Sequence, residues 1–350
     1  MNEKPFCGKP ILGITMGDPS GIGPEISVKA LGQAKVYEIC RPLIIGDRGI
    51  MERAVREAVK RKDIIIHPVS SVGECFFKPG TIDVYDLRNI EASKLKIAAV
   101  DAASGEAAFS SVKKAIELAM AGEIDATITN PLNKEALNLA GHHYAGHTEI
   151  YAELSGTKDY SMMLADGDLR VLHVSTHVSL REACERVKKD RVLKVIELAH
   201  NACRSLGISE PRVAVAGLNP HAGESGLFGR EEIEEITPAI EAAKVKGINA
   251  TGPIPPDTVF AKAHGGMYDI VVAMYHDQGH IPLKTLGFQY DRNNGKWQAI
   301  SGVNITLGLP IIRSSVDHGT AFDQAWQGSA NESSLISAIE YGVKLALNRQ

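Results

Sequence analysis

Three histidines stand where chemistry is often found in an α/β protein, just beyond apolar segments of strand length. His177, His221 and His276 each follow such a segment after a short turn. If these segments are neighbouring parallel strands, their carboxyl ends share one edge of a sheet, and the three imidazoles can meet there. Three neutral imidazoles suit Zn²⁺ or another first-row divalent ion, and the coordination positions left open are typical of a catalytic site. The alternative is that each histidine caps a turn or packs alone.

Polar residues beside these histidines fit the same hypothesis. Asn219 and Glu224 flank the second histidine, and Asp277 directly follows the third. Amides and carboxylates in such positions fix the tautomer and orientation of a ligating imidazole. Asp257 lies in a Pro-Pro-Asp turn, where it is either a turn former or a catalytic carboxylate.

A second group of residues is suited to a phosphate. His147 and Thr148 offer side-chain donors at the start of a helical segment, and Lys284 and Arg313 offer positive charge. The planar guanidinium is a fork that matches phosphate or carboxylate. Asn304 lies in an apolar segment, where an unpaired amide would be costly, so it should have a partner in the protein or in a ligand.

The usual nucleotide-binding motifs are absent from this sequence. There is no G-x-x-x-x-G-K-[ST], and no G-x-G-x-x-G follows a predicted strand, so a dinucleotide would need another binding mode. Residues 17–25 (GDPSGIGPE) follow the first predicted strand and place Pro and Glu at the start of a helix. This segment is either an anion site at a helix N-terminus or only a tight turn.

Alternating strand and helix patterns must position these residues. Apolar, β-branched segments of strand length alternate with segments of helical period, which predicts a largely parallel sheet covered by helices on both faces. Helices are expected at 109–121 and 190–206. Strands are expected at 11–15, 42–46, 63–68, 126–129, 169–175, 212–217 and 269–275.

The composition of the chain excludes several classes of protein. The chain has 350 residues, 44% of them hydrophobic and 23% charged, with a net charge of -4 and no dense block of Lys or Arg. We therefore expect one large α/β unit or two lobes, and neither a nucleic-acid nor a membrane partner. The N-terminus has no apolar leader, so we expect a cytoplasmic protein. Five cysteines without a C-x-x-C pair argue against disulfides and against a thiolate zinc site.

Taken together, the motifs make this chain resemble the 4-hydroxythreonine-4-phosphate dehydrogenase family of vitamin B6 biosynthesis and its paralogues. The resemblance covers nearly the whole chain. It rests on GDPSGIGPE at 17–25, TNPLNK at 129–134, GHTE at 146–149, GLNPHAGE at 217–224, MYHDQG at 274–279 and RSSVDHGT at 313–320.

The resemblance implies a fold like that of isocitrate and isopropylmalate dehydrogenases, with two interlocked α/β lobes around a cleft and no Rossmann fingerprint. We expect residues 1–130 and 310–350 in the first lobe, on the side that binds NAD. Residues 131–309 would form the second lobe, with the metal site and the interface of a homodimer.

Site residues carry over from the family position by position. The resemblance implies one divalent ion, Zn, Mn, Co or Mg, on the three strand-end histidines, with the site completed near the dimer interface. A loop similar to the one that holds the adenosine half of NAD is formed by His318, Gly319, Thr320 and Asp323. NADP is possible, although the carboxylate of Asp323 disfavours a 2′-phosphate. Substrate contacts would be His147, Thr148, Lys284, Asn304 and Arg313.

An insertion at 289–301 separates Lys284 from Asn304 and departs from the biosynthetic pattern. It resembles the catabolic paralogues that oxidise D-threonate or D-erythronate 4-phosphate. The expected reaction is therefore NAD-dependent oxidation of such an acid and its decarboxylation to dihydroxyacetone phosphate and CO2, with Lys134, Asp257 and Asp277 as candidate acid/base groups. Oxidation of 4-phosphohydroxy-L-threonine is the alternative.

Two other classes of protein use the same residues. Three histidines could form a closed zinc site that stabilises a non-enzymatic sugar-phosphate binding protein. They could also serve a metal-dependent hydrolase that releases phosphate without NAD.

Overall fold

The structure is a computed structural model, which describes residues 8–287, 290–292, 296–297 and 302–349. The chain divides into two compact units. The first contains the chain up to Lys158 and the returning segment Leu309–Leu347, and the second contains Asp159–Gly308. The first unit is therefore discontinuous, as interlocked lobes require. The return lies next to the expected position at 309/310, whereas the outward crossing lies after Lys158 and not after residue 130.

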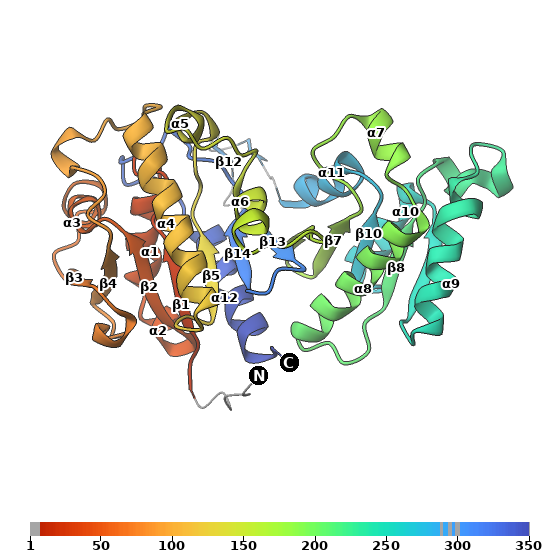
Figure 1. Cartoon of the computed structure of the whole chain (residues 1–350), viewed down its shortest axis with the longest axis horizontal. Coiled ribbons are helices and arrows are strands. Elements are labelled where there is room, and N and C mark those ends of the chain that lie inside the picture. Colours follow the sequence, from red (N-terminus) through yellow and green to blue (C-terminus); the bar gives the residue numbers. More distant parts are fainter. Residues whose placement is uncertain (1–7, 288–289, 293–295, 298–301, 350) are drawn as a thin grey trace. The chain divides into compact units, whose positions relative to one another are not determined.

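The first unit is a parallel α/β layer structure. Its sheet has the strand order β3-β4-β2-β1-β5-β14, and each neighbouring pair is parallel. The strands are β1 (Ile11–Thr15), β2 (Arg41–Gly46), β3 (Ile65–Val69), β4 (Thr81–Asp86), β5 (Ala126–Thr129) and β14 (Arg313–Val316). The main helices are α1 (Gly23–Leu31), α2 (Ala34–Ile39), α3 (Arg48–Arg53), α4 (Ala102–Met120), α5 (Lys134–Leu139), α6 (His147–Leu154) and α12 (Ser333–Leu347), as Figure 1 shows.

Helix α4 explains why residues 131–158 belong to this unit. Its buried face, which includes Val112, Ala115 and Ile116, packs on the apolar residues of β2 and on the helices that follow β5. Gly105 lets α5 approach closely, because a Cβ at this position would overlap the carbonyl of Ala136. This packing joins α5 and α6 to the first unit although Pro131 interrupts the sequence pattern.

The second unit has a mixed sheet. Its strand order is β13-β6-β7-β10-β8-β9, in which β13, β6 and β7 are antiparallel and the remaining pairs are parallel. The strands are β6 (Ser161–Asp166), β7 (Leu169–His173), β8 (Val213–Ala216), β9 (Ala250–Ile254), β10 (Ile270–Ala273) and β13 (Val303–Leu307). The α-helices are α7 (Leu180–Glu185), α8 (Lys189–Ser205), α9 (Thr237–Val245), α10 (Pro256–His264) and α11 (His276–Gly287).

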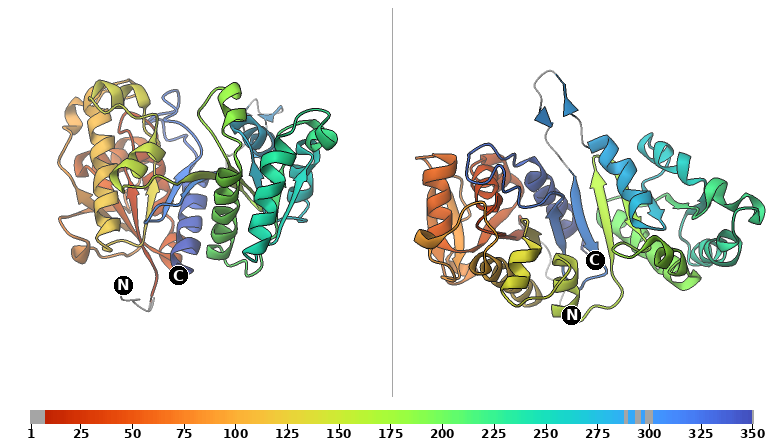
Figure 2. Two further views of the ribbon diagram at one scale, coloured as in Figure 1. Left: turned by 45° about the vertical axis from the view of Figure 1, so that its right-hand side comes forward. Right: turned by 90° about the horizontal axis from the view of Figure 1, so that it is seen from above.

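The insertion at 289–301 lies only partly within the described residues. Two short strands, β11 (Tyr290–Asp291) and β12 (Lys296–Trp297), pair antiparallel in a small sheet of their own (Figure 2).

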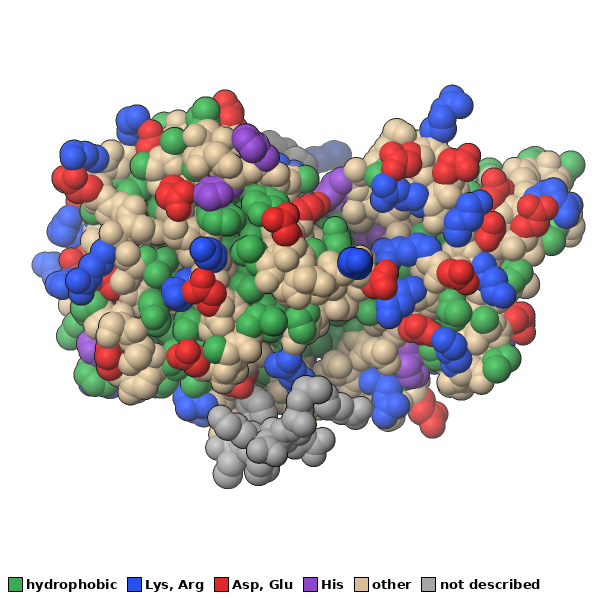
Figure 3. Space-filling view, viewed as in Figure 1, with side chains coloured by type: hydrophobic (Ala, Val, Ile, Leu, Met, Phe, Trp, Pro, Cys, Tyr) green, Lys and Arg blue, Asp and Glu red, His purple; other side chains and the backbone are tan. Residues whose placement is uncertain are grey.

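Charges of both signs are interspersed over the face of the molecule in Figure 3, where Lys and Arg alternate with Asp and Glu. Among the described residues, no helix is long and apolar enough to cross a membrane.

Candidate functional site

The first unit contains a buried cation at the start of β14. Arg313 is only 3% exposed. Its Nη2 donates to Thr129 Oγ1 at 3.0 Å, its Nη1 lies 3.4 Å from Thr148 Oγ1, and its guanidinium stacks over the Tyr151 ring at 5.4 Å. Burial lowers the pKa of Arg313 to about 10, against the opposing effects of Tyr151 and Glu149. The guanidinium is thus charged at neutral pH and largely without water, which is the condition for strong anion binding.

A neutral imidazole lies beside this cation. His147 begins α6, and burial together with the Arg313 charge lowers the pKa of His147 well below its usual range. Its buried Nε2 has no hydrogen-bond partner within the described part of the chain. Because a buried polar atom normally has a partner, this nitrogen points to a ligand or a water molecule.

Lys134 is brought to the same place by the end of β5 and the turn after it. Asn133 caps α5 by accepting a hydrogen bond from the Ala136 amide at 2.9 Å, so Lys134 occupies the first turn of that helix. Its Cε lies 4.0 Å from where a Cβ of Gly146 would be. The first unit therefore groups Lys134, His147, Thr148 and Arg313, which are four of the residues predicted from sequence.

The segment expected to bind NAD folds onto residues 17–25. The Ile22 amide donates to the Thr320 carbonyl at 3.1 Å, and Trp326 Nε1 donates to the Pro19 carbonyl at 2.9 Å. A Cβ on Gly319 would meet nothing within 4 Å, and Asp323 is exposed. An open glycine backbone beside an exposed carboxylate suits the ribose of a dinucleotide, so these residues fit NAD.

Residues 17–25 themselves form a tight turn. Asp18 is fully buried, and its Oδ1 accepts a hydrogen bond from the Ser20 amide at 2.8 Å. The Glu25 carboxylate accepts from the amides of Gly328 and Ala330 at 3.1 and 2.9 Å. These carboxylates hold the protein's own backbone, which favours the turn over the anion site.

The second unit places the three predicted histidines after adjacent strands. The order β7-β10-β8 puts the ends of the strands that precede His177, His276 and His221 side by side. His177 and His276 lie near each other, with ring centroids 5.8 Å apart. The Nδ1 of His276 is hydrogen-bonded to Asp277 Oδ1 at 2.7 Å, which leaves Nε2 for a ligand.

His221 is not brought into this pair. It lies in the segment Pro220–Gly226, where five consecutive residues from His221 to Ser225 have φ between 43° and 82°, and its ring is 6.3 Å from that of Phe228. Within the described residues, no three His, Cys, Asp or Glu side chains are grouped so that they could hold a metal ion. Two of the three predicted ligands therefore fit a shared divalent ion, and the third does not in this conformation; metal binding stays a prediction.

Two further histidines join the pair, and the sequence interpretation did not assign them. His280 stacks on His276 with ring centroids 3.6 Å apart and planes inclined by 12°, and His173 lies 4.7 Å from His280. His173 is fully buried, and burial lowers its pKa to about 3. The spacing of His276 and His280, four residues apart in a helical segment, is the signal that could have found the second of these histidines.

The remaining predicted residues of this unit lie on β13, α11 and α10. Asn304, on β13, donates through Nδ2 to Met162 Sδ at 2.8 Å, and its buried Oδ1 has no partner within the described residues. Lys284 is on α11 and partly buried. Asp257 is exposed in the first turn of α10, where a carboxylate is favoured by the helix dipole.

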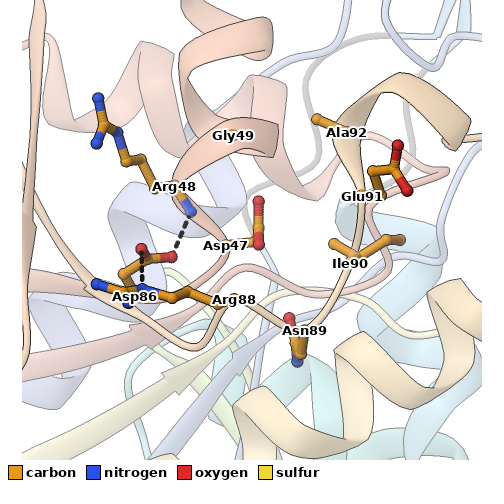
Figure 4. A pocket seen from close by; sticks show the side chains of 9 residues that line it. All are labelled: Asp47, Arg48, Gly49, Asp86, Arg88, Asn89, Ile90, Glu91 and Ala92. Carbon is orange, nitrogen blue, oxygen red and sulfur yellow. Dashed lines mark hydrogen bonds and ion pairs between the residues drawn. The ribbon is translucent and has the colours of Figure 1, made fainter.

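A cavity of about 600 Å³ lies elsewhere in the first unit, at the ends of β2 and β4 (Figure 4). None of the predicted residues lines it. Asp47 accepts from the Ile50 amide at 3.0 Å, and Asp86 accepts from the Arg48 amide at 3.0 Å and from Arg88 at 3.3 Å. The Asp47 carboxylate thus caps α3, and the Asp86 carboxylate connects the start of α3 with the loop after β4.

The fold and these groups define a class: an α/β protein of two interlocked units, with a buried arginine beside hydroxyl and imidazole groups in one and neighbouring histidines at a sheet edge in the other. Residues 38–342 match the family model described as pyridoxal phosphate biosynthetic protein PdxA. The chain belongs to this family.

Similar proteins cover almost the whole chain. A D-threonate 4-phosphate dehydrogenase of Pectobacterium atrosepticum is 49% identical over 96% of this chain and 99% of its own length. The protein of the same name from Salmonella typhimurium is 48% identical over 95% and 98%. The crystal structure of a 4-hydroxythreonine-4-phosphate dehydrogenase from Klebsiella pneumoniae is 45% identical and superposes with a TM-score of 0.84, covering 97% of this chain and 100% of that one.

Proposed function

We propose that this protein oxidises D-threonate 4-phosphate or D-erythronate 4-phosphate with NAD and releases dihydroxyacetone phosphate and CO2. The observation that carries the proposal is the sequence identity of 48–49%, over nearly the full length, to proteins named D-threonate 4-phosphate dehydrogenase. The desolvated Arg313 pocket supports the phosphorylated substrate on independent grounds.

The phosphate is the part of the substrate that the chain is best built to hold. Arg313 supplies the charge, Thr148 a hydroxyl, and His147 a neutral imidazole that can donate or accept. With Lys284 and Asn304 as further contacts, this binding energy orients the reacting carbon without taking part in bond changes.

Oxidation removes a hydride from the carbon that bears the 3-hydroxyl, and the hydride goes to NAD while the hydroxyl proton goes to a base. Among the three predicted acid/base groups, Lys134 is the one that lies beside the anion pocket, so we assign it this proton transfer. Asp277 instead orients His276, and Asp257 is an exposed carboxylate at a helix start.

Decarboxylation follows because the oxidised product is a β-keto acid. The bond between the carboxylate carbon and its neighbour breaks, CO2 leaves, and the electron pair remains as an enolate that takes up a proton. A divalent ion held by His177 and His276, with His221 as the third ligand, would lower the pKa of the substrate hydroxyl and stabilise the enolate. The four positive-φ residues other than glycine from His221 to Ser225 are conformationally costly, so this segment is suited to rearrange when its histidine gains a ligand.

A second candidate reaction is the oxidation of 4-phosphohydroxy-L-threonine. It is favoured by the family model and by a relative of that name, 4-hydroxythreonine-4-phosphate dehydrogenase, from Desulforapulum autotrophicum, 46% identical over 95% of this chain. The insertion at 289–301 favours the D-threonate reaction.

The test is an absorbance assay at 340 nm with NAD or NADP and a divalent ion on three substrates: D-threonate 4-phosphate, D-erythronate 4-phosphate and 4-phosphohydroxy-L-threonine. We expect NADH with one of the first two. Faster oxidation of 4-phosphohydroxy-L-threonine would select the second candidate. Release of inorganic phosphate without NADH would indicate a hydrolase, and binding without either product would indicate a binding protein.

We further propose a homodimer, on the strength of the family resemblance. Light scattering coupled to size exclusion measures the mass in solution, and a monomeric mass would refute it.

A further inference from the structure

The segment 318–330, which contains the residues proposed to bind NAD, needs contacts from outside to keep its shape. It has no helix or strand and consists of tight turns, in which the Gln324 amide donates to the Ala321 carbonyl at 3.0 Å and the Gln327 amide donates to the Gln324 carbonyl at 3.3 Å. Ala321 and Trp326 have left-handed backbone conformations, with φ of 43° and 64°. Residues with a Cβ keep such conformations only where the surroundings impose them.

Helix α1 supplies a buried ion pair at one end of this segment. The Glu25 side chain is 1% exposed, and its Oε1 lies 3.0 Å from Nζ of Lys29, one turn further along the helix. The carboxylate accepts from the amides of Gly328 and Ala330, as described above, and the ammonium donates to the carbonyls of the same two residues at 2.8 and 2.5 Å. Two residues of the segment are thus bound through both their N–H and their C=O groups.

A charged pair holds the backbone more firmly than neutral side chains would. Burying two charges is costly, and the cost is recovered only where the geometry is good and the remaining polar atoms are bonded. Glu25 and Lys29 meet this condition, because all four contacts with the segment are charge-assisted hydrogen bonds. Gly328 is also confined from another direction, since a Cβ there would lie 2.7 Å from the carbonyl oxygen of Ala58.

The turn formed by residues 17–25 holds the other part of the segment. The Ile22 amide donates to the Thr320 carbonyl, and the Trp326 indole donates to the Pro19 carbonyl. The segment is therefore fastened at several points to one region of the chain, which consists of this turn and the helix that follows it.

We propose that Glu25 and Lys29 are positioning residues for the cofactor. They hold the segment 318–330 in the shape that binds the adenosine half of NAD, and they act through the backbone of Gly328 and Ala330. The inference rests on the proposed function, because it requires a dinucleotide at this segment. It predicts that the pair contributes to cofactor affinity separately from its contribution to folding stability.

Three variants and two controls test this role. Lys29→Met leaves a buried carboxylate without its partner, Glu25→Gln removes the opposite charge, and the double variant Glu25→Gln/Lys29→Met leaves no unpaired charge. Glu38→Gln and Lys35→Met make the same chemical changes at exposed positions of α2. Dissociation constants of NADH and of ADP-ribose are measured by calorimetry on the full-length protein. Melting temperatures and hydrogen exchange of the peptide that contains residues 328 and 330 are measured for each variant.

We expect the double variant and both single variants to bind NADH about 10- to 100-fold more weakly than the wild type, as follows if the binding-competent shape falls to about 1–10% of the population. ADP-ribose has the adenosine half without nicotinamide, so it should be weakened by the same factor. Hydrogen exchange at 328 and 330 should be faster in all three variants. The melting temperature should fall in Lys29→Met and recover in the double variant, whereas the affinity should not recover. Both controls should match the wild type.

Three results would overturn the positioning role. They are wild-type affinity in the double variant, recovery of affinity together with the melting temperature, and a loss for NADH without a loss for ADP-ribose. The first two would show that the ion pair serves only the fold, and the third would place the effect at the nicotinamide end.

Failure of this inference is distinguishable from failure of the proposed function. If the wild type forms NADH from substrate and every variant binds NADH equally well, the positioning role is wrong and the reaction stands. If the wild type binds neither NADH nor ADP-ribose, the cofactor assignment itself is wrong and the positioning role falls with it.

Discussion

Replacing Arg313 with methionine distinguishes the effect of its buried guanidinium on folding stability from its effect on anion binding. The guanidinium is buried, and its pKa is lowered to about 10. At about 1.36 kcal/mol for each tenfold change in the proton equilibrium, carrying this charge costs about 3 kcal/mol of folding free energy. The sign is that of a buried cation: the cost is fully present below pH 10 and is relieved only as the side chain loses its proton at higher pH.

The methionine variant removes this cost together with the contacts of the guanidinium. The hydrogen bonds to Thr129 and Thr148 contribute about 1 kcal/mol each, and the effect of Tyr151 is already contained in the lowered pKa of Arg313. The cost of burying the charge and the contribution of its contacts therefore nearly cancel. We therefore expect the free energy of unfolding of Arg313→Met to lie within about 1 kcal/mol of the wild type, although truncation of a buried side chain commonly costs 2–5 kcal/mol.

Stabilisation by phosphate should differ between the wild type and Arg313→Met. Inorganic phosphate at about 100 times its dissociation constant stabilises a protein that binds it by about 2.7 kcal/mol. We expect this stabilisation in the wild type and in the surface control Arg204→Met, and none in Arg313→Met. The measurements are urea unfolding followed by circular dichroism at pH 7.5, with and without phosphate, and kcat/KM with the phosphorylated substrate.

Two results would refute this reasoning. A loss of more than about 3 kcal/mol in Arg313→Met without ligand would show that the guanidinium is a structural tie between β5, β14 and α6. Equal stabilisation of both proteins by phosphate would show that the anion binds elsewhere.

Three other predictions address the metal, the buried carboxylate and the insertion. Zn²⁺ or Mn²⁺ should protect Pro220–Gly226 from proteolysis in the wild type and not in His276→Ala; equal protection would exclude this histidine as a ligand. Burial raises the pKa of Asp18 to about 6, so the folded protein carries an unfavourable charge that is absent below pH 4 and complete above pH 6. Asp18→Asn keeps the acceptor for the Ser20 amide and should be more stable than the wild type by up to about 3 kcal/mol at pH 8 but equal to it near pH 3.5, as unfolding curves at both pH values will show. Deleting residues 289–301 should shift the ratio of kcat/KM for D-threonate 4-phosphate to that for 4-phosphohydroxy-L-threonine, and an unchanged ratio would contradict a role in substrate choice.

Sequence alone predicted the elements that depend on local periodicity. The expected helix at 190–206 is α8, and the strands preceding His177, His221 and His276 are neighbours in one sheet. The convergence of strand ends follows from parallel topology, which the alternation of strands and helices made predictable. The hairpin of β6 and β7, which the interpretation missed, did have a signal, since a two-residue turn beginning at Gly167 (φ 55°) separates the two strands.

Long-range packing was beyond the sequence pattern. The boundary expected after residue 130 rested on the interruption at Pro131, but α5 and α6 pack on α4, with Gly105 allowing the close approach. The position of His221 was equally hidden, because a run of left-handed residues that includes Ala222, Glu224 and Ser225 has no signature in residue types that normally avoid this conformation. Which histidine meets which partner was decided by backbone geometry that only the folded chain shows.

Several features that cost stability lie at the proposed sites, and their position there is an argument about function. A desolvated guanidinium at Arg313, unpartnered ring nitrogens of His147 and His173, and the left-handed segment at His221 each lower the stability of the fold. None improves the packing of the core. Features that lower stability without improving the packing are tolerated where they serve a ligand, which supports assigning ligands to these three places.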